Sequence, residues 1–154
     1  MRTMALMLAA LTLTACVRTR TDPATGNVDV DIESPAQRGE EWEGSIRGLN
    51  MYSAMTGTAR ARVVEGVADV TVNLRGGTPG QTHPWHVHEG KCGSGGPIVG
   101  NPSEYPPITI GAAGNATATA KVQKNLNEAL DYHVNFHASA TEMATIIACG
   151  EIDD

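Results

Sequence analysis

Apolar and polar residues alternate along most of the chain beyond Trp42, and this period of two constrains the fold more than any other feature. Successive side chains of a β-strand point to opposite faces, so the alternation predicts strands with one buried face. The segment 67–74 shows it most clearly, with Ala68, Val70, Val72 and Leu74 on the predicted inner face. The alternation and the turn signals together predict eight strands, near 43–49, 56–63, 67–74, 82–89, 106–110, 115–121, 131–138 and 145–152.

Glycine-rich turn signals separate these segments at 76–80, 93–97 and 111–114, and only 125–130 has the pattern of a short helical turn. Many short strands with such turns predict an all-β sandwich or barrel. The 154 residues suffice for one domain of this kind, and the net charge of -6 argues against a nucleic-acid partner. There is no apolar run near ~20 residues, so we expect no membrane-spanning helix.

The first fifteen residues have the pattern of an export signal. Arg2 precedes an apolar stretch over 4–13, and small residues follow. The sequence Leu13-Thr-Ala-Cys16 resembles a bacterial lipobox, which implies cleavage before Cys16 and attachment of lipid to it. An ordinary signal peptide or a short N-terminal helix is the alternative. We therefore expect a bacterial envelope protein, periplasmic or surface-exposed, whose partner is the membrane that holds the anchor.

The polar segment that follows predicts a flexible tether over residues 16–40 ahead of a domain over 41–154. Within the tether, Val28, Val30 and Ile32 alternate with polar residues, which is compatible with one short strand.

All five histidines lie in two of the predicted strands. His83, His86 and His88 belong to the first, and His133 and His137 to the second. His86 and His88 share one face of their strand, and His133 and His137 share one face of theirs. If the two strands are neighbours, three or four imidazoles meet at one place, and neutral imidazole suits copper, zinc, iron and nickel. For a single histidine, an ordinary solvated or hydrogen-bonded side chain is the alternative.

Two further cysteines, Cys92 and Cys149, lie close in sequence to these strands. Export makes a disulfide between them chemically available. A zinc site of cysteine and histidine is the alternative, although the wide separation of the two cysteines favours the disulfide.

Three motifs resemble the bacterial copper/zinc superoxide dismutases. The segment Gly80-Gln-Thr-His83-Pro-Trp-His86-Val-His88-Glu-Gly-Lys-Cys92 is similar to their G-x-H-G-F-H-x-H pattern followed by a cysteine. Ala148-Cys149-Gly150-Glu-Ile152 is similar to their last strand, and 105–112 to the strand after their zinc loop. The resemblance implies an eight-stranded Greek-key barrel over about 40–154, with a disulfide between Cys92 and Cys149. It also implies copper ligands at His86, His88 and His137 and a structural histidine at His83.

The chain departs from this family where zinc and superoxide would bind. Residues 93–104 contain no histidine and no aspartate, so we expect neither a zinc site nor the histidine that bridges copper and zinc. His133 is then the candidate for a fourth copper ligand. The loop over 138–148 is short, and Ile146 occupies the position of the family's active-site arginine. An aliphatic side chain cannot stabilise an anion, which puts fast dismutation in doubt.

Three functions are compatible with these residues. The first is slow, zinc-free superoxide dismutation by copper, and the second is copper binding without catalysis, with copper donors and acceptors as partners. The third is a metal-free barrel with a structural role. A zinc hydrolase that uses Glu89 as its base is a minor alternative.

Overall fold

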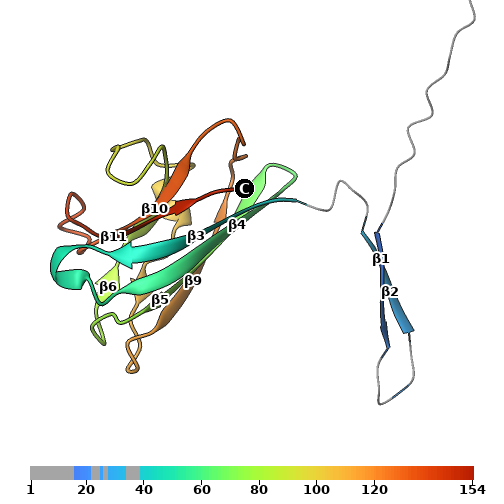
Figure 1. The fold of residues 1–154 in the computed structure, drawn as a ribbon, viewed down its shortest axis with the longest axis horizontal. Coiled ribbons are helices and arrows are strands. Elements are labelled where there is room, and N and C mark those ends of the chain that lie inside the picture. The colour runs from blue at the N-terminus through green and yellow to red at the C-terminus, as the bar shows by residue number, and fades with distance from the viewer. Residues whose placement is uncertain (1–15, 22–24, 26–27, 34–38) are drawn as a thin grey trace, which may run out of the picture. The chain divides into compact units, whose positions relative to one another are not determined.

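The computed structural model of the chain describes residues 16–21, 25, 28–33 and 39–154 (Figure 1). They separate into two units, a hairpin before residue 39 and a compact all-β unit from Gly39 to Asp154. The predicted signal peptide, residues 1–15, lies outside the described residues. Among those that are described, no helix is long and apolar enough to cross a lipid bilayer.

The first unit is an antiparallel hairpin of β1 (Cys16–Thr21) and β2 (Val28–Glu33). Cys16 lies opposite Glu33, and Thr21 lies opposite Val28. Strand β2 contains the alternating residues from Val28 to Ile32, where the sequence is compatible with a strand. Strand β1 is not anticipated in the expected tether, although its β-branched residues, Val17, Thr19 and Thr21, favour extended backbone.

The second unit is built on a curled, antiparallel sheet that forms a half-barrel (Figure 1). Its strand order is β7-β10-β11-β3-β4-β5-β9. The bounds of these strands are β3 (Glu40–Gly48), β4 (Thr56–Val64), β5 (Val67–Arg75), β7 (Trp85–Glu89), β9 (Ala116–Val122), β10 (Tyr132–His137) and β11 (Ile146–Ile152). Two short strands, β6 (Thr82–His83) and β8 (Ile108–Thr109), form a separate pair, and single 3-10 turns occupy η2 (Asn50–Tyr52) and η3 (Pro102–Glu104). The all-β prediction is therefore confirmed.

Each of the eight predicted strands has a counterpart, but the predicted strand 82–89 is divided in two. Pro84 separates β6 from β7 because proline has no N–H to donate to a ladder. The segment 125–130 forms a hydrogen-bonded turn and not the helical turn that its pattern allowed. The Asn127 side chain accepts from the Ala129 N–H at 3.0 Å, and the Leu130 N–H donates to the Asn127 carbonyl at 2.9 Å. Asparagine side chains stabilise turns in this way.

The core lies on the concave side of the sheet. The four apolar residues of the 67–74 pattern are all buried there, as the alternation predicts. Trp85 and Phe136 stack at a centroid distance of 6.2 Å, and the Trp85 indole N–H donates to the Pro106 carbonyl at 2.8 Å. Burying the two rings stabilises the pairing of β7 with β10, and this pairing positions the histidines.

The free edge of β7 is covered by the loop that follows it. The Glu89 N–H donates to the Pro97 carbonyl at 3.0 Å, and the Val99 N–H donates to the Val87 carbonyl at 2.9 Å. These bonds satisfy edge groups and fix residues 90–99 beside the histidine-bearing strand.

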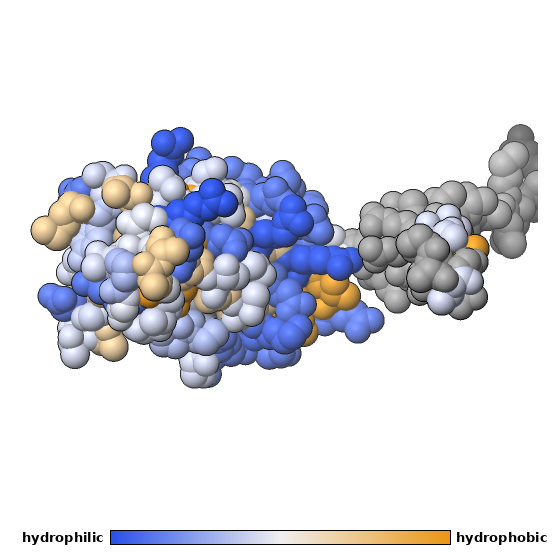
Figure 2. All heavy atoms as spheres, turned by 90° about the horizontal axis from the view of Figure 1, so that it is seen from below, coloured by the Kyte–Doolittle hydropathy of each residue, from blue (hydrophilic) through white to orange (hydrophobic). Residues whose placement is uncertain are grey.

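The face drawn in Figure 2 is largely hydrophilic, with separate hydrophobic spots rather than one broad patch.

Candidate metal site

The pairing of β7 with β10 brings the two histidine-bearing segments together. His88 lies opposite His133, and His86 lies opposite Asn135. The intervening side chains, among them Trp85 and Phe136, are fully buried in the core, so the histidines project from the other face of the sheet. This arrangement confirms the prediction that the two strands are neighbours and present their histidines on one face.

Three of the histidines converge. One nitrogen each of His86, His88 and His137 lies within 4.8 Å of the other two, and His86 Nδ1 is 3.2 Å from His137 Nε2. Two ligands bound at ~2.0–2.1 Å to a tetrahedral or trigonal ion are separated by about 3.3–3.6 Å. The His86–His137 separation is close to this range, so the three imidazoles could hold a single ion.

Backbone carbonyls orient two of these rings. The Nδ1–H of His137 donates to the Met143 carbonyl at 2.6 Å, and the Nδ1–H of His88 donates to the Gly96 carbonyl at 2.9 Å. A carbonyl can only accept, so these contacts place the proton on Nδ1 and leave Nε2 with its lone pair in the neutral ring. Metal-binding histidines are oriented by the same kind of second hydrogen bond.

His88 Nε2 has a further property that points to a ligand. This atom is buried and has no hydrogen-bond partner in the part of the chain that the structure describes. A buried acceptor without a partner is unfavourable by about 1–3 kcal/mol, and a bound cation removes that penalty. The candidate donors are thus His88 Nε2 and His137 Nε2 together with one ring nitrogen of His86, whose Nδ1–H donates to His137 Nε2.

The three rings are in the uncharged form that binds metal. Burial is the main cause that lowers the pKa of His86 to about 4, and repulsion from His137 and His88 lowers it further. Burial also lowers the pKa values of His88 and His137. At neutral pH the imidazoles are therefore uncharged, and a metal ion does not have to compete with a second proton on each ring.

His133 lies beside this cluster and not in it. Its ring stacks on that of His88 at a centroid distance of 5.3 Å. Its Nδ1–H donates to the Gly90 carbonyl at 2.7 Å, and its Nε2 is 3.2 Å from the Asn135 amide nitrogen. Both ring nitrogens are therefore engaged in hydrogen bonds, which argues against the expectation that His133 is the fourth ligand.

His83 contacts the site through the backbone. Its Nδ1–H is 3.1 Å from the His137 carbonyl and 3.0 Å from the Ala138 carbonyl, and the ring is buried. It thereby attaches β6 to the end of β10, next to His137. This contact agrees with a structural task for His83, as the resemblance implies.

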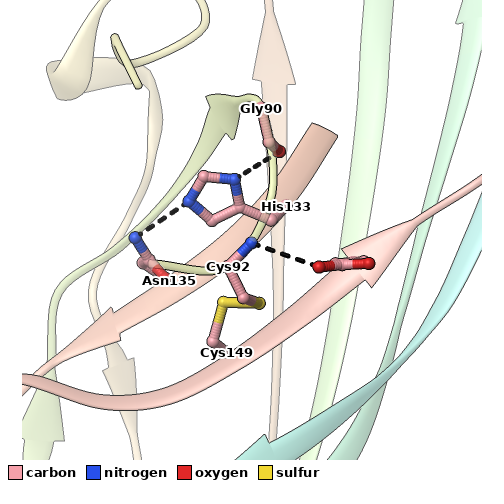
Figure 3. The surroundings of a disulfide bond; sticks show 6 residues. Gly90, Cys92, His133, Asn135 and Cys149 are labelled. Atoms are coloured by element: carbon pink, nitrogen blue, oxygen red, sulfur yellow. Dashed lines mark hydrogen bonds between the residues drawn. A yellow bond between two sulfur atoms is a disulfide. The ribbon is translucent and has the colours of Figure 1, made fainter. Parts of the chain in front are cut away.

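Cys92 and Cys149 form a disulfide, so the structure favours this interpretation over a cysteine-containing zinc site. The bond joins the loop after β7 to β11 and lies close to His133 and Asn135 (Figure 3). Gly90 and Gly96, whose carbonyls hold His133 and His88, lie on either side of Cys92 in that loop. The disulfide therefore restrains the segment that orients two of the histidines.

A pocket of about 540 Å³ opens beside the cluster and is lined by His88 and His137 among others. Its apolar lining includes Leu49, Met143 and Ile146. None of the described residues that line it is an acid, a lysine or an arginine. Ile146 thus lines the same pocket as His88 and His137, and the described lining includes no cation that would attract an anion.

The residues that sequence reasoning missed are Gly90, Gly96 and Met143. They act through backbone carbonyls, which leave no signal in residue type. No protein-family model matches the chain, and no curated protein matches its sequence. Three imidazoles are suitable ligands for several metals, so the geometry establishes a possible metal site without determining its metal.

Proposed function

We propose that the chain is an envelope lipoprotein whose domain over 41–154 binds copper and is related to the bacterial copper/zinc superoxide dismutases. The convergence of His86, His88 and His137 within 4.8 Å is the observation that carries this proposal. The half-barrel with its β6-β8 pair is compatible with an eight-stranded Greek-key barrel of that family. Cys16 is the proposed site of lipid attachment.

Copper is favoured over the other candidate metals by two features. The donors are three uncharged imidazole nitrogens without a carboxylate, and divalent copper has the highest affinity of the first-row metals for such nitrogen ligands. The motifs that contain His86, His88 and Cys92 also resemble those of a copper enzyme. The loop over 93–104 has no histidine or aspartate to hold a second metal, so we propose a copper site without zinc.

Superoxide dismutation is the second candidate function, because the pocket gives small molecules a route to His88 and His137. Catalysis would require copper to alternate between its two oxidation states while an anion approaches it. The aliphatic side chain of Ile146 does not attract anions, and the negative net charge repels them at long range. We therefore expect dismutation to be slow, and copper binding without catalysis is the better supported function.

Metal content tests the proposal. The chain with Cys16→Ser, which avoids lipidation, is loaded with copper or zinc, dialysed, and measured for bound metal. We expect one copper per chain, and we expect the variant His86→Ala/His137→Ala to lose it. The variant Gln81→Ala changes an exposed residue outside the cluster and is expected to retain copper.

Each alternative has its own result. Absence of stoichiometric copper binding would favour the third function, a metal-free structural barrel. Preferential retention of zinc would favour a zinc hydrolase. Retention of copper by the double histidine variant would mean that the ion binds elsewhere. If copper binds but superoxide decays no faster than in buffer, the dismutase function is excluded and copper binding stands.

A further inference from the structure

A relay of hydrogen bonds fixes the orientation of the Asn135 side chain. It starts at the Gly90 carbonyl, which accepts from His133 Nδ1–H at 2.7 Å (Figure 3). In the neutral ring, His133 Nε2 is then an acceptor, and the Asn135 amide nitrogen lies 3.2 Å from it. That nitrogen is the donor, so the amide plane has only one orientation that satisfies His133.

The relay leaves the amide oxygen of Asn135 without a partner. Asn135 is 7% exposed, and its Oδ1 is buried and has no hydrogen-bond partner among the described residues. Its nitrogen is committed to His133, so the side chain cannot turn to satisfy the oxygen without breaking that bond. Buried amide oxygens in folded proteins nearly always have a partner, which indicates that one is supplied from outside the chain.

The position of Asn135 relates this oxygen to the three converging histidines. Asn135 lies directly opposite His86 across the β7-β10 pair and two residues before His137 on the same face of β10. It also lines the pocket that His88 and His137 line. Because its nitrogen faces His133, its oxygen is the end of the amide group that is turned away from His133.

We propose that Asn135 Oδ1 is the fourth donor to the ion held by His86, His88 and His137, and that His133 is the positioning residue that presents it. This inference rests on the proposed copper site. It accounts for two orphaned buried atoms, His88 Nε2 and Asn135 Oδ1, with one ion. A carbonyl oxygen is a hard ligand, so it stabilises Cu(II) more than the softer Cu(I).

The test compares the two oxidation states of copper in Asn135→Leu, in the Cys16→Ser background. Affinities for Cu(II) and for Cu(I) are measured separately by competition with a chelator specific for each ion. We expect the substitution to lower Cu(II) affinity about 10- to 100-fold and to change Cu(I) affinity much less. The electron paramagnetic resonance spectrum of the bound Cu(II) is expected to shift because an oxygen ligand has been lost.

Three further variants distinguish the loss of a metal ligand from a general loss of stability. Asn115→Leu makes the same substitution at an exposed site remote from the histidines, and it should bind both ions like the parent. Asn135→Asp keeps an oxygen in place and should retain Cu(II) affinity even if the leucine variant fails to fold. His133→Phe removes the positioning bond and should lower Cu(II) affinity in the same direction as Asn135→Leu.

The proposal is overturned if Asn135→Leu leaves Cu(II) affinity and the spectrum unchanged, or if it weakens both oxidation states equally. A loss of Cu(II) binding in Asn135→Asp overturns it as well. None of these results would contradict the proposed copper site of three histidines. A parent chain that binds no copper is a different outcome, because it overturns the proposed function together with this inference.

Discussion

Removal of the Cys92–Cys149 disulfide tests how the histidine cluster is held in place on the sheet. The perturbation is the double variant Cys92→Ala/Cys149→Ala, made in the Cys16→Ser background so that no free thiol remains. The two cysteines are 57 residues apart in the sequence. In the chain-entropy model, opening a loop of this length favours the unfolded state by about 4 kcal/mol at 25 °C. For a unit of roughly 116 residues, this lowers the melting temperature by about 15 °C.

Urea unfolding measures this loss directly. Trp42 and Trp85 are buried, and both belong to the sheet, so their fluorescence follows the unfolding of the all-β unit. The midpoint should fall in the double variant, while the slope of free energy against urea should stay close to that of the parent, because the same surface is exposed. Chemical reduction of the parent should reproduce the shift.

The disulfide should also affect metal affinity. Cys92 belongs to the loop whose Gly96 carbonyl orients His88, and its own N–H is 3.4 Å from the Glu151 carboxylate. Releasing this loop should therefore weaken copper binding in addition to stability. A stability loss below about 1 kcal/mol would refute the loop-entropy reasoning. Copper affinity that does not change would refute the idea that the disulfide restrains the ligand geometry.

Three further predictions concern single groups. Acidification should destabilise the metal-free protein, because the unfolded chain binds a proton at His86 below about pH 6.5 while the folded chain resists it until about pH 4. Urea unfolding at pH 7 and at pH 4.5 should differ by about 2–3 kcal/mol, and a weaker pH dependence is expected for His86→Gln. Ile146→Arg places a cation in the pocket lining. It should strengthen azide binding to the copper-loaded chain, measured by optical titration, and raise any dismutase rate, measured by superoxide decay. No change in either measurement would mean that the missing charge does not limit anion binding or turnover. Gly96→Ala should cost several kcal/mol in urea unfolding and weaken copper binding, because its Cβ would overlap the Glu89 carbonyl; normal stability would contradict this.

The strands could be predicted because the alternation of side chains reflects burial directly. Every apolar residue that the pattern assigns to the inner face of 67–74 is buried in the structure. Strand β1 of the hairpin was not predicted. The segment is mostly polar, and the prediction of strands relied on apolar residues that become buried. The division of 82–89 at Pro84 follows from the missing N–H of proline and could have been inferred from the sequence.

The composition of the histidine cluster was only partly predictable. The alternation of side chains along a strand places four histidines on one face of the sheet. It cannot show which of them converge, because convergence depends on the register between strands and on the loop carbonyls that orient each ring. His133 lies opposite His88 and binds Gly90, whereas His137 follows an irregularity in the β10-β11 pairing and is held by Met143. Such backbone contacts depend on how the loops fold over the sheet, and residue types do not encode them locally.

The arrangement of the loops bears on what the site is suited to do. Loop 90–96 is held at Cys92 by the disulfide and contributes the carbonyls of Gly90 and Gly96, while Met143 orients His137 from the opposite loop. A donor set restrained from both sides retains one geometry, which favours tight binding of an ion in one oxidation state. Rapid catalysis by copper needs in addition a charge that attracts the anion, and the described pocket lining contains none. The same restraints on His86, His88 and His137 therefore favour retention of the proposed copper ion over turnover.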